Sequence, residues 1–518
     1  MTVAPASLEP LTALNQRLRA AAVAMLGEAP PVQADVPNDT AEVLSALVSE
    51  ARRTLRTDHA WLLSTAASGL LPRPEEVEDL LRAFELSAGS AEAEIALLHR
   101  ARRAIATNGA VDRRLVVVSG AVVVDVSYSA QNDKHTGIQR VTREVCPRWA
   151  TRHDITLVAW ADGERSLRTL HASERARVLE WPADRSLVRD RRSTGDDPDE
   201  SPVTLVPWQS TVVLPEVAQG TTALPLTALA QYSGNAVSAI GYDAIPVVSA
   251  DLRPVVEPDQ FVGYLNVVKY ATRVAGISSS ATAEFRGFAE AVRAQGLPGP
   301  TVLEVQLAAD APLSAAGRPA PASSSPAVPA TTDGAGRPAL PRVLCVGSHE
   351  LHKNHLAVLH AAELLWREGL EFELVFMGGP GWDTSGYDAR VAALMAAGRP
   401  LRTLSSVTDV ELGELYRSAR FTVFPSLHEG FGLPVAESLA SGTPVVTTNY
   451  GSTAEIASRG GCLLADPRDD DDVAGCMRAL LTDEELFGRL KAEALAFEPR
   501  TWDVYADELW EALVVAAR

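Results

Sequence analysis

The stretch SLHEGFGLPVAESLASGTPVV, at residues 426–446, places two carboxylates, Glu429 and Glu437, on either side of a loop of small residues. Gly430 and Gly432 leave the backbone bare, so its N–H groups can approach a ligand. A strand-like run precedes the loop and an apolar helical pattern follows it, which predicts a helix whose positive end favours an anion. The stretch therefore predicts a carboxylate and a phosphate site within one loop.

The second carboxylate lies inside the predicted helix. Glu437 is one turn from the helix start, among apolar residues such as Val435 and Leu439. A charged group there is costly unless it meets a hydroxyl or a cation. A vicinal diol, such as that of a ribose, would satisfy both of its oxygens. The loop and helix together favour a ligand that carries phosphate and hydroxyl groups.

Alternating strand-like and helical runs position this loop. From Val116, runs such as VVVSGAVVVDVS and STVVLP alternate with helical stretches, and a second alternation begins with RVLCVG after a Pro-, Ala- and Ser-rich segment. This rhythm predicts α/β architecture with mainly parallel sheets and helices on both faces. We predict two facing doubly wound, Rossmann-like domains at residues 111–310 and 341–499, joined by a flexible linker at residues 311–340. The active site is expected in the cleft between them.

The two ends of the chain read as helical. Residues 1–110 show a capping-box pattern at Asp39 and a second helix after Pro74, and they predict an accessory or dimerisation segment. Residues 500–518 form the last predicted helix. Its apolar stripe is expected to belong to the core and not to the site, and consists of Trp502, Tyr505, Leu509 and Leu513.

The composition narrows the class of protein. The chain has 518 residues, 46% hydrophobic and 22% charged, which indicates a globular protein of two or three domains. Its formal net charge of −19 argues against nucleic acid as the main partner, because phosphate binding needs a basic surface. No leader pattern or bilayer-length apolar stretch is present, so a cytoplasmic protein is predicted. No metal site is expected, because the cysteines lack metal-ligand spacing: Cys146, Cys345, Cys462 and Cys476.

The string EGFGLPVAE followed by SGTPVV closely resembles a known signature. It is the Glu, seven residues, Glu pattern of the family-4 (group 1) retaining glycosyltransferases, which have the GT-B fold. The resemblance implies that Glu429 contacts the transferred sugar and that Glu437 binds the nucleotide ribose. It also implies that the loop between them binds sugar hydroxyls and phosphate through Gly430, Phe431, Gly432 and Leu433.

A second stretch, VGSHELHKNHLAVLHAA, resembles the strand, loop and helix in which that family neutralises the donor diphosphate. The resemblance places Lys353 at the basic position and Gly347 at the start of the loop. An arginine often found early in the loop is replaced by Ser348, and His352 stands where some relatives carry a second cation. Lys353 and the helix terminus are therefore expected to bind the diphosphate.

Two further segments, DVSYSAQNDKHTGIQRVTREV and AIGYDAIPVV, resemble bacterial transferases that build surface polysaccharides. Asp125 and Asp243 end predicted strands, and Thr136 and Gly137 lie in a loop before a helix, so all four are expected to line the cleft. Gly137 would let the backbone approach the donor. Asp243 is either a catalytic contact to sugar or acceptor or a turn residue at a strand end. Many relatives carry a His–Asp pair here, whereas this chain has Tyr242 before the aspartate.

The resemblance implies a retaining, metal-independent transferase with no permanently bound cofactor. It would move a sugar from a nucleoside-diphosphate sugar, with GDP-mannose favoured over a UDP-sugar, to a glycan or lipid-linked acceptor. Two alternatives stay open: an epimerase or hydrolase of the same fold, and a non-catalytic scaffold acting through its N-terminal helices. Contact of the basic residues 185–192 with the inner face of a membrane, and homo-oligomers formed through residues 1–110, stay open as well. The acidic runs at residues 196–200 and 468–472 read as solvated charge.

Overall fold

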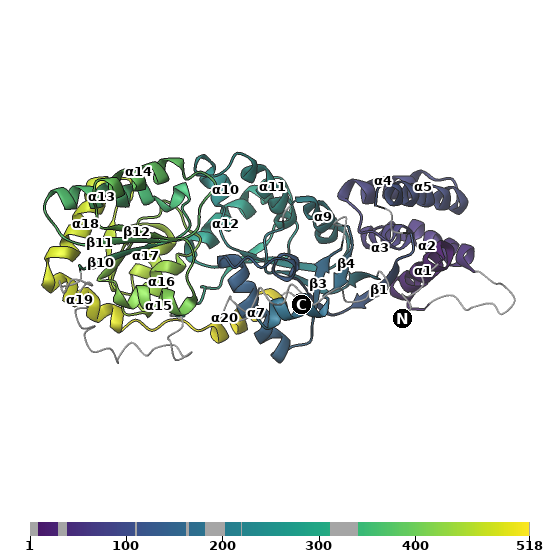
Figure 1. Cartoon of the computed structure of the whole chain (residues 1–518). Helices are drawn as coiled ribbons and strands as arrows, with labels where there is room; N and C mark the ends of the chain where they lie inside the picture. Colours follow the sequence, from purple (N-terminus) through teal and green to yellow (C-terminus); the bar gives the residue numbers. More distant parts are fainter. Residues whose placement is uncertain are drawn as a thin grey trace, which may run out of the picture.

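The computed structural model describes residues 9–28, 39–108, 111–161, 165–181, 203–218, 220–310 and 340–516. The predicted linker, apart from its last residue, lies outside these ranges, as do the basic and acidic stretches at residues 185–192 and 196–200. Figure 1 shows three parts in a row: a helical part, a sheet domain beside it and a second sheet domain at the far end.

The first part is helical, as the sequence predicts. The prediction of a capping box at Asp39 is wrong, because the Asp39 carboxylate instead accepts a hydrogen bond from Asn15 Nδ2 at 2.7 Å and pairs with Arg19. One apolar core includes both Trp61 of this part and Trp208 of the neighbouring sheet, and it therefore joins the two. The helices are α1 (Pro10–Leu26), α2 (Thr40–Thr54), α3 (Thr57–Ser68), α4 (Pro74–Leu86) and α5 (Ser90–Asn108).

The first sheet has nine strands among the described residues, in the order β1-β5-β4-β3-β2-β6-β7-β8-β9. The run VVVSGAVVVDVS divides into two strands, one at the sheet edge and one at its centre. All neighbours are parallel except β4, which is antiparallel to β3 and β5. The strands are β1 (Arg114–Ser119), β2 (Val122–Asp125), β3 (Ile155–Trp160), β4 (Leu167–Thr169), β5 (Val203–Trp208), β6 (Thr211–Leu214), β7 (Ala236–Gly241), β8 (Arg273–Gly276) and β9 (Thr301–Glu304).

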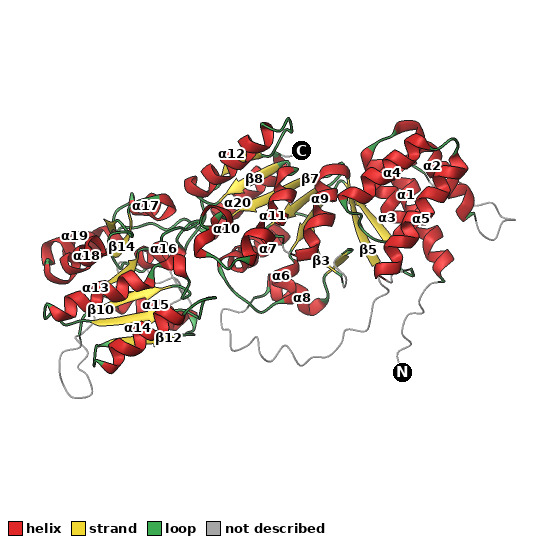
Figure 2. Cartoon of the chain, turned by 90° about the horizontal axis from the view of Figure 1, so that it is seen from above, coloured by secondary structure: helices red, strands yellow, loops and turns green. Residues whose placement is uncertain are grey.

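Both faces of this sheet are buried. In β2, Val123 joins the core shared with the N-terminal helices, whereas Val122 and Val124 join a second core on the other face. Figure 2 shows the strands lying among helices. These helices are α6 (Ser127–Gln131), α7 (Gly137–Arg152), α8 (Ala172–Leu179), α9 (Ala223–Tyr232), α10 (Ile245–Val248), α11 (Val256–Lys269) and α12 (Ser279–Arg293), with short 3-10 turns η2 (Gly220–Thr222) and η3 (Ala250–Leu252).

The second sheet is wholly parallel, with six strands among the described residues in the order β12-β11-β10-β13-β14-β15. The chain builds outwards from β10 on one side and then from β13 on the other, so the loops after these two strands flank the switch point where such sheets bind ligands. The strands are β10 (Arg342–Val346), β11 (Glu373–Met377), β12 (Leu401–Leu404), β13 (Phe421–Phe424), β14 (Val445–Thr448) and β15 (Cys462–Ala465).

The helices of this domain complete its two faces. They are α13 (His355–Arg367), α14 (Ser385–Ala396), α15 (Asp409–Ser418), α16 (Leu433–Ala440), α17 (Gly451–Ala457), α18 (Asp470–Thr482) and α19 (Glu484–Leu495), with the 3-10 turn η4 (Leu351–Lys353) before α13. Within the described ranges, no helix is long and apolar enough to cross a membrane.

The last helix, α20 (Trp502–Trp510), and the turn η5 (Glu511–Val515) return to the first sheet domain, where α20 lies beside α7 (Figure 1). Trp149 Nε1 donates to the Ala506 carbonyl at 2.9 Å, and Ser238 Oγ donates to the Leu513 carbonyl at 2.9 Å. The predicted apolar stripe is buried, which confirms its place in the core. The chain end therefore ties the two sheet domains together.

Candidate active site

A cleft of about 870 Å³ lies between the two sheet domains. One wall is formed by the loops after β10 and β13 together with α15 and α16, and the other by the start of α7 and the loop after β7. The structure places around this cleft every residue to which the sequence assigned a donor-binding or catalytic role: Gly137, Asp243, Gly347, Lys353, Glu429, Gly430, Phe431, Gly432, Leu433 and Glu437.

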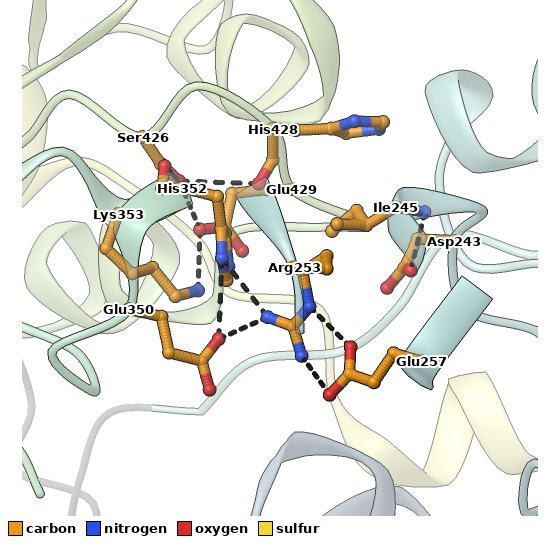
Figure 3. Close-up of polar contacts among 10 residues, drawn as sticks. All are labelled: Asp243, Ile245, Arg253, Glu257, Glu350, His352, Lys353, Ser426, His428 and Glu429. Carbon is orange, nitrogen blue, oxygen red and sulfur yellow. Dashed lines mark hydrogen bonds and ion pairs between the residues drawn. The ribbon is translucent and has the colours of Figure 1, made fainter. Parts of the chain in front are cut away.

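A lysine and a glutamate from neighbouring loops form an ion pair at the centre of the cleft. Lys353 Nζ lies 2.6 Å from Glu429 Oε1, and Ser426 Oγ donates to the same oxygen at 2.6 Å (Figure 3). The two charged side chains are only 16% and 11% exposed. In a partly desolvated pair of this kind, the ammonium group can bind an incoming anion. Once it does, the carboxylate can accept hydrogen bonds from sugar hydroxyls.

The loop that carries Glu429 depends on two glycines. Gly432, the residue before α16, has φ 100°, a conformation that favours glycine. Pro434 has no N–H and the Val435 N–H donates to the Gly432 carbonyl at 3.0 Å, so Leu433 supplies the amide at the start of α16. At Gly430 a Cβ atom would lie 2.3 Å from the Tyr242 carbonyl oxygen of the opposite domain. Ser278 Oγ donates to the Gly430 carbonyl at 2.7 Å. The bare backbone at Gly430 thus lets the two domains meet.

Asp243 is both a turn residue and a cleft residue. Its Oδ1 accepts the Ile245 N–H at 3.1 Å, as a strand-end aspartate does. Burial raises the pKa of Asp243 to about 6, and the charges of Glu284 and Glu429 add to this effect. Its carboxyl group therefore exchanges a proton close to neutral pH while facing the cleft.

An imidazole reaches the region of Asp243 from the other domain. His428 Nε2 lies 2.6 Å from Glu284 Oε1, and its Nδ1 lies 2.8 Å from Ser249 Oγ. Burial alone would lower the pKa of His428, but the hydrogen bond and charge of Glu284 outweigh burial and raise it. Sequence reasoning missed this residue, although it directly precedes Glu429, because its partners are distant in the chain.

A third charged contact joins the two domains at the start of η4. Arg253 pairs with Glu350 and also with Glu257 on its own side (Figure 3). Burial lowers the pKa of the neighbouring His352 to about 2, and the cations Lys353 and Arg253 contribute. The imidazole at the position where some relatives carry a second cation is therefore neutral at physiological pH.

Glu437 has the two partners that its burial requires. Its Oε2 accepts a hydrogen bond from the Tyr416 hydroxyl at 3.0 Å, and its Oε1 forms an ion pair with Arg140 of α7. The prediction that this carboxylate meets a hydroxyl or a cation is confirmed, but both partners belong to the protein. Sequence reasoning did not single out Arg140, although TGIQRV places it in the first turn of a helix beside the glycine loop.

Two expectations about the cleft need correction. Asp125 does not line it, because its carboxylate is held in the sheet by Ser127 and by Trp160 Nε1 at 2.9 Å. Trp502 is buried, as expected, yet it also lines the cleft, where its ring centroid lies 5.7 Å from Arg140 Cζ. Both differences arise from the return of α20 and the packing of β2 and β3, which are tertiary features.

The acidic run at residues 468–472 acts at the start of a helix. Asp469 caps α18 by accepting hydrogen bonds from the Asp471 and Asp472 amides. In the part of the chain that the structure describes, no group of three or more His, Cys, Asp or Glu side chains is placed to hold a metal ion.

The second sheet domain matches a known family. Residues 337–496 fit the family model described as glycosyl transferases group 1. This domain belongs to the group 1 glycosyltransferases. The arrangement of two facing doubly wound domains is the GT-B fold, and the chain is similar in fold to HepE from Anabaena, solved in complex with UDP and glucose (TM-score 0.51, 13% identity, 76% of this chain and 100% of that chain).

Bacterial mannosyltransferases are among the similar sequences. O-antigen chain mannosyltransferase B of Escherichia coli is 36% identical over 145 residues, which cover 27% of this chain and 37% of that protein. The serotype-specific mannosyltransferase WbdA of Escherichia coli is 25% identical over 343 residues, 65% of this chain and 38% of that protein. This chain thus spans less than half the length of these two relatives.

Proposed function

We propose that this protein is a retaining glycosyltransferase that moves a sugar from a nucleoside-diphosphate sugar to a glycan or lipid-linked acceptor. The observation that carries the proposal is the Lys353–Glu429 pair beside the start of α16, inside a cleft between two doubly wound domains. These are the groups that such a transfer needs. A fixed cation and helix amides stabilise a leaving diphosphate, and a carboxylate holds the sugar.

The donor would lie along the second domain. Its diphosphate would meet Lys353 and the Leu433 amide at the start of α16, next to the Gly347 loop, and its sugar would contact Glu429. Its ribose would bind Glu437, which lies one helical turn further along α16. As the bond from the sugar to the diphosphate stretches, negative charge grows on the leaving oxygens, and Lys353 is already positioned to stabilise it.

The acceptor would enter from the first domain, where Asp243 faces the same cleft. We assign no general base. In the front-face course proposed for this reaction, the departing phosphate accepts the proton of the acceptor hydroxyl. Asp243 would contact the sugar or the acceptor, and its pKa of about 6 lets it accept or donate a hydrogen bond near neutral pH.

GDP-mannose is the favoured donor. The support comes from the relatives named as mannosyltransferases, including the MMP alpha-(1->4)-mannosyltransferase of Mycolicibacterium hassiacum, 31% identical over 153 residues, 29% of this chain and 36% of that protein. HepE was solved with UDP, so UDP-sugars belong in the same test. The proposal includes no metal, because Lys353 and the start of α16 supply the positive charge.

The test is release of nucleoside diphosphate by the full-length protein from a panel of GDP- and UDP-sugars, with and without a mannoside acceptor, and with EDTA in parallel. We expect release that depends on the acceptor, a product that keeps the anomeric configuration, and no loss in EDTA. Glu429→Gln is the control for background hydrolysis. Equal release without acceptor would indicate a hydrolase. No release from any donor would indicate a scaffold.

A further inference from the structure

An arginine of the first domain pairs with Glu437, the carboxylate that we assign to the nucleotide ribose. Arg140, in the first turn of α7, forms an ion pair with Oε1 of Glu437, and the Tyr416 hydroxyl donates to Oε2. Both oxygens of Glu437 are therefore engaged before any ligand enters. A ribose diol can reach this carboxylate only if Arg140 leaves it or shares it.

Neither partner of this pair can be left alone at low cost. The side chain of Glu437 is 7% exposed and that of Arg140 is 22% exposed. A buried charge without a partner is strongly unfavourable. If the ribose takes Glu437, the guanidinium must find another anion within reach. The stacking of Arg140 over Trp502, at 5.7 Å from the ring centroid, does not supply one.

The position of α7 shows where that anion would be. Gly137 is the first residue of α7, and a Cβ atom there would lie 3.6 Å from Leu433 Cδ1, on the first residue of α16. The first turns of the two helices thus face each other across the cleft. The diphosphate assigned to the start of α16 would lie beside Arg140.

We propose that Arg140 exchanges partners when the donor binds: it holds Glu437 in the empty cleft and binds the diphosphate in the donor complex. This proposal rests on the proposed function, since it needs a nucleoside-diphosphate ligand. Asp409 and Glu144 also contribute negative charge near Arg140, but they do so in the empty cleft as well. Only the ligand adds a new anion, and a guanidinium binds phosphate oxygens in a bidentate way. Through this exchange, the contact between the two domains at Arg140 depends on whether the ligand carries phosphates.

The exchange predicts different effects on nucleosides and nucleoside diphosphates. In the wild-type protein, guanosine or uridine must share Glu437 with Arg140 or break the Arg140–Glu437 pair without replacing it, whereas GDP or UDP supplies a new partner. Arg140→Gln removes both the cation that competes with the ribose for Glu437 and the guanidinium that would bind the diphosphate. We expect the affinity for GDP or UDP to fall by about tenfold or more and that for the matching nucleoside to stay equal or rise.

The experiment is calorimetric titration of the full-length protein with guanosine, uridine, GDP and UDP. The matched control is Arg152→Gln, which removes another arginine of α7 that pairs with Asp503 and Asp507 away from the cleft. The control should keep the wild-type ratio of diphosphate to nucleoside affinity. Arg140→Lys, which keeps the charge without the planar fork, should lie between Arg140→Gln and the wild type. Arg140→Lys also tests the exchange if Arg140→Gln does not fold.

Three outcomes separate the ideas. A lower ratio of diphosphate to nucleoside affinity in Arg140→Gln, but not in Arg152→Gln, supports the exchange. An unchanged ratio, or equal weakening of nucleoside and diphosphate, would mean that Arg140 is only a structural contact, although the donor site would stand. If the wild-type protein binds none of the four ligands, the proposed donor site fails and the exchange fails with it.

Discussion

The two walls of the cleft are built in different ways. On the wall of the second domain, Lys353 and Glu429 come from loops after neighbouring parallel strands and neutralise each other within one domain. On the wall of the first domain, Arg140 comes from a helix start and Asp243 from a strand end, while Glu284, from α12, joins the domains outside the cleft lining. The wall of the second domain holds a complete charged pair. On the wall of the first domain, Arg140 finds its partner across the cleft, whereas Asp243 accepts the Ile245 N–H of its own domain.

The contacts between the two domains are specific. Arg140 pairs with Glu437, Glu284 holds His428, and Ser278 binds the backbone of Gly430. Each joins one residue of the first domain to one residue of the loop-and-helix segment that contains the signature. The comparison predicts that changes to Lys353 or Glu429 mainly alter the chemical step, whereas changes to the first domain's residues also alter how the domains meet or the stability of the fold. The predictions below test this division.

The largest effect is expected at the carboxylate assigned to the sugar. Glu429→Gln should lower kcat by about 10²–10³-fold while leaving GDP or UDP affinity nearly unchanged, because we assign this side chain to the sugar and not to the nucleotide. Steady-state kinetics and nucleotide titration on the same preparation measure both. Equal loss of nucleotide binding would show that the role assigned to Glu429 is wrong.

The cation of the same wall should affect binding and turnover together. Lys353→Ala removes the charge that we assign to the diphosphate before and during bond cleavage, so kcat/KM should fall by about 10²-fold and nucleoside-diphosphate affinity should fall with it. Arg152→Gln, a cation lost outside the cleft, is the control. Normal turnover in Lys353→Ala would remove this lysine from the site.

On the first wall we expect an effect on stability. Because the folded-state pKa of Asp243 is raised from 3.8 to about 6, its ionisation opposes folding above that range and has no effect below the unfolded value. Asp243→Asn should therefore gain up to about 2–3 kcal/mol of unfolding free energy at pH 7.5 and nothing near pH 3. Urea denaturation across this range measures the difference. A gain that does not vary with pH would exclude proton linkage at Asp243.

The smallest expected effect concerns the imidazole between the walls. The pKa of His428 is raised above 6.5, so the charged contact with Glu284 stabilises the fold below pH 6.5, and this stabilisation is lost as the pH rises through the folded-state pKa. His428→Gln, neutral throughout, should lose about 1 kcal/mol at pH 6 and much less at pH 9. Glu284→Gln should show the same window. A loss of equal size at both pH values would point to packing and not to charge.

Much of the second wall could be predicted from the sequence. The strand Phe421–Phe424, the glycine loop and the helix that follows depend on residues adjacent in the chain, and the structure has them as expected. Lys353 was assigned to the donor diphosphate through the resemblance of its segment to the known family, and it lines the cleft. The partners of Asp39 and the division of one apolar run into β1 and β2 were missed, because packing against distant elements overrides local pattern.

By itself the sequence determined the local order of strand, loop and helix and the residue types that a phosphate and a sugar would need, because these depend on periodicity and short-range geometry. Only the tertiary structure decided that Arg140 faces Glu437, that Glu284 holds His428, and that burial keeps His352 neutral. Each of these facts depends on the approach of side chains far apart in the chain. That approach sets the local dielectric and the nearest charge, and no single segment encodes either.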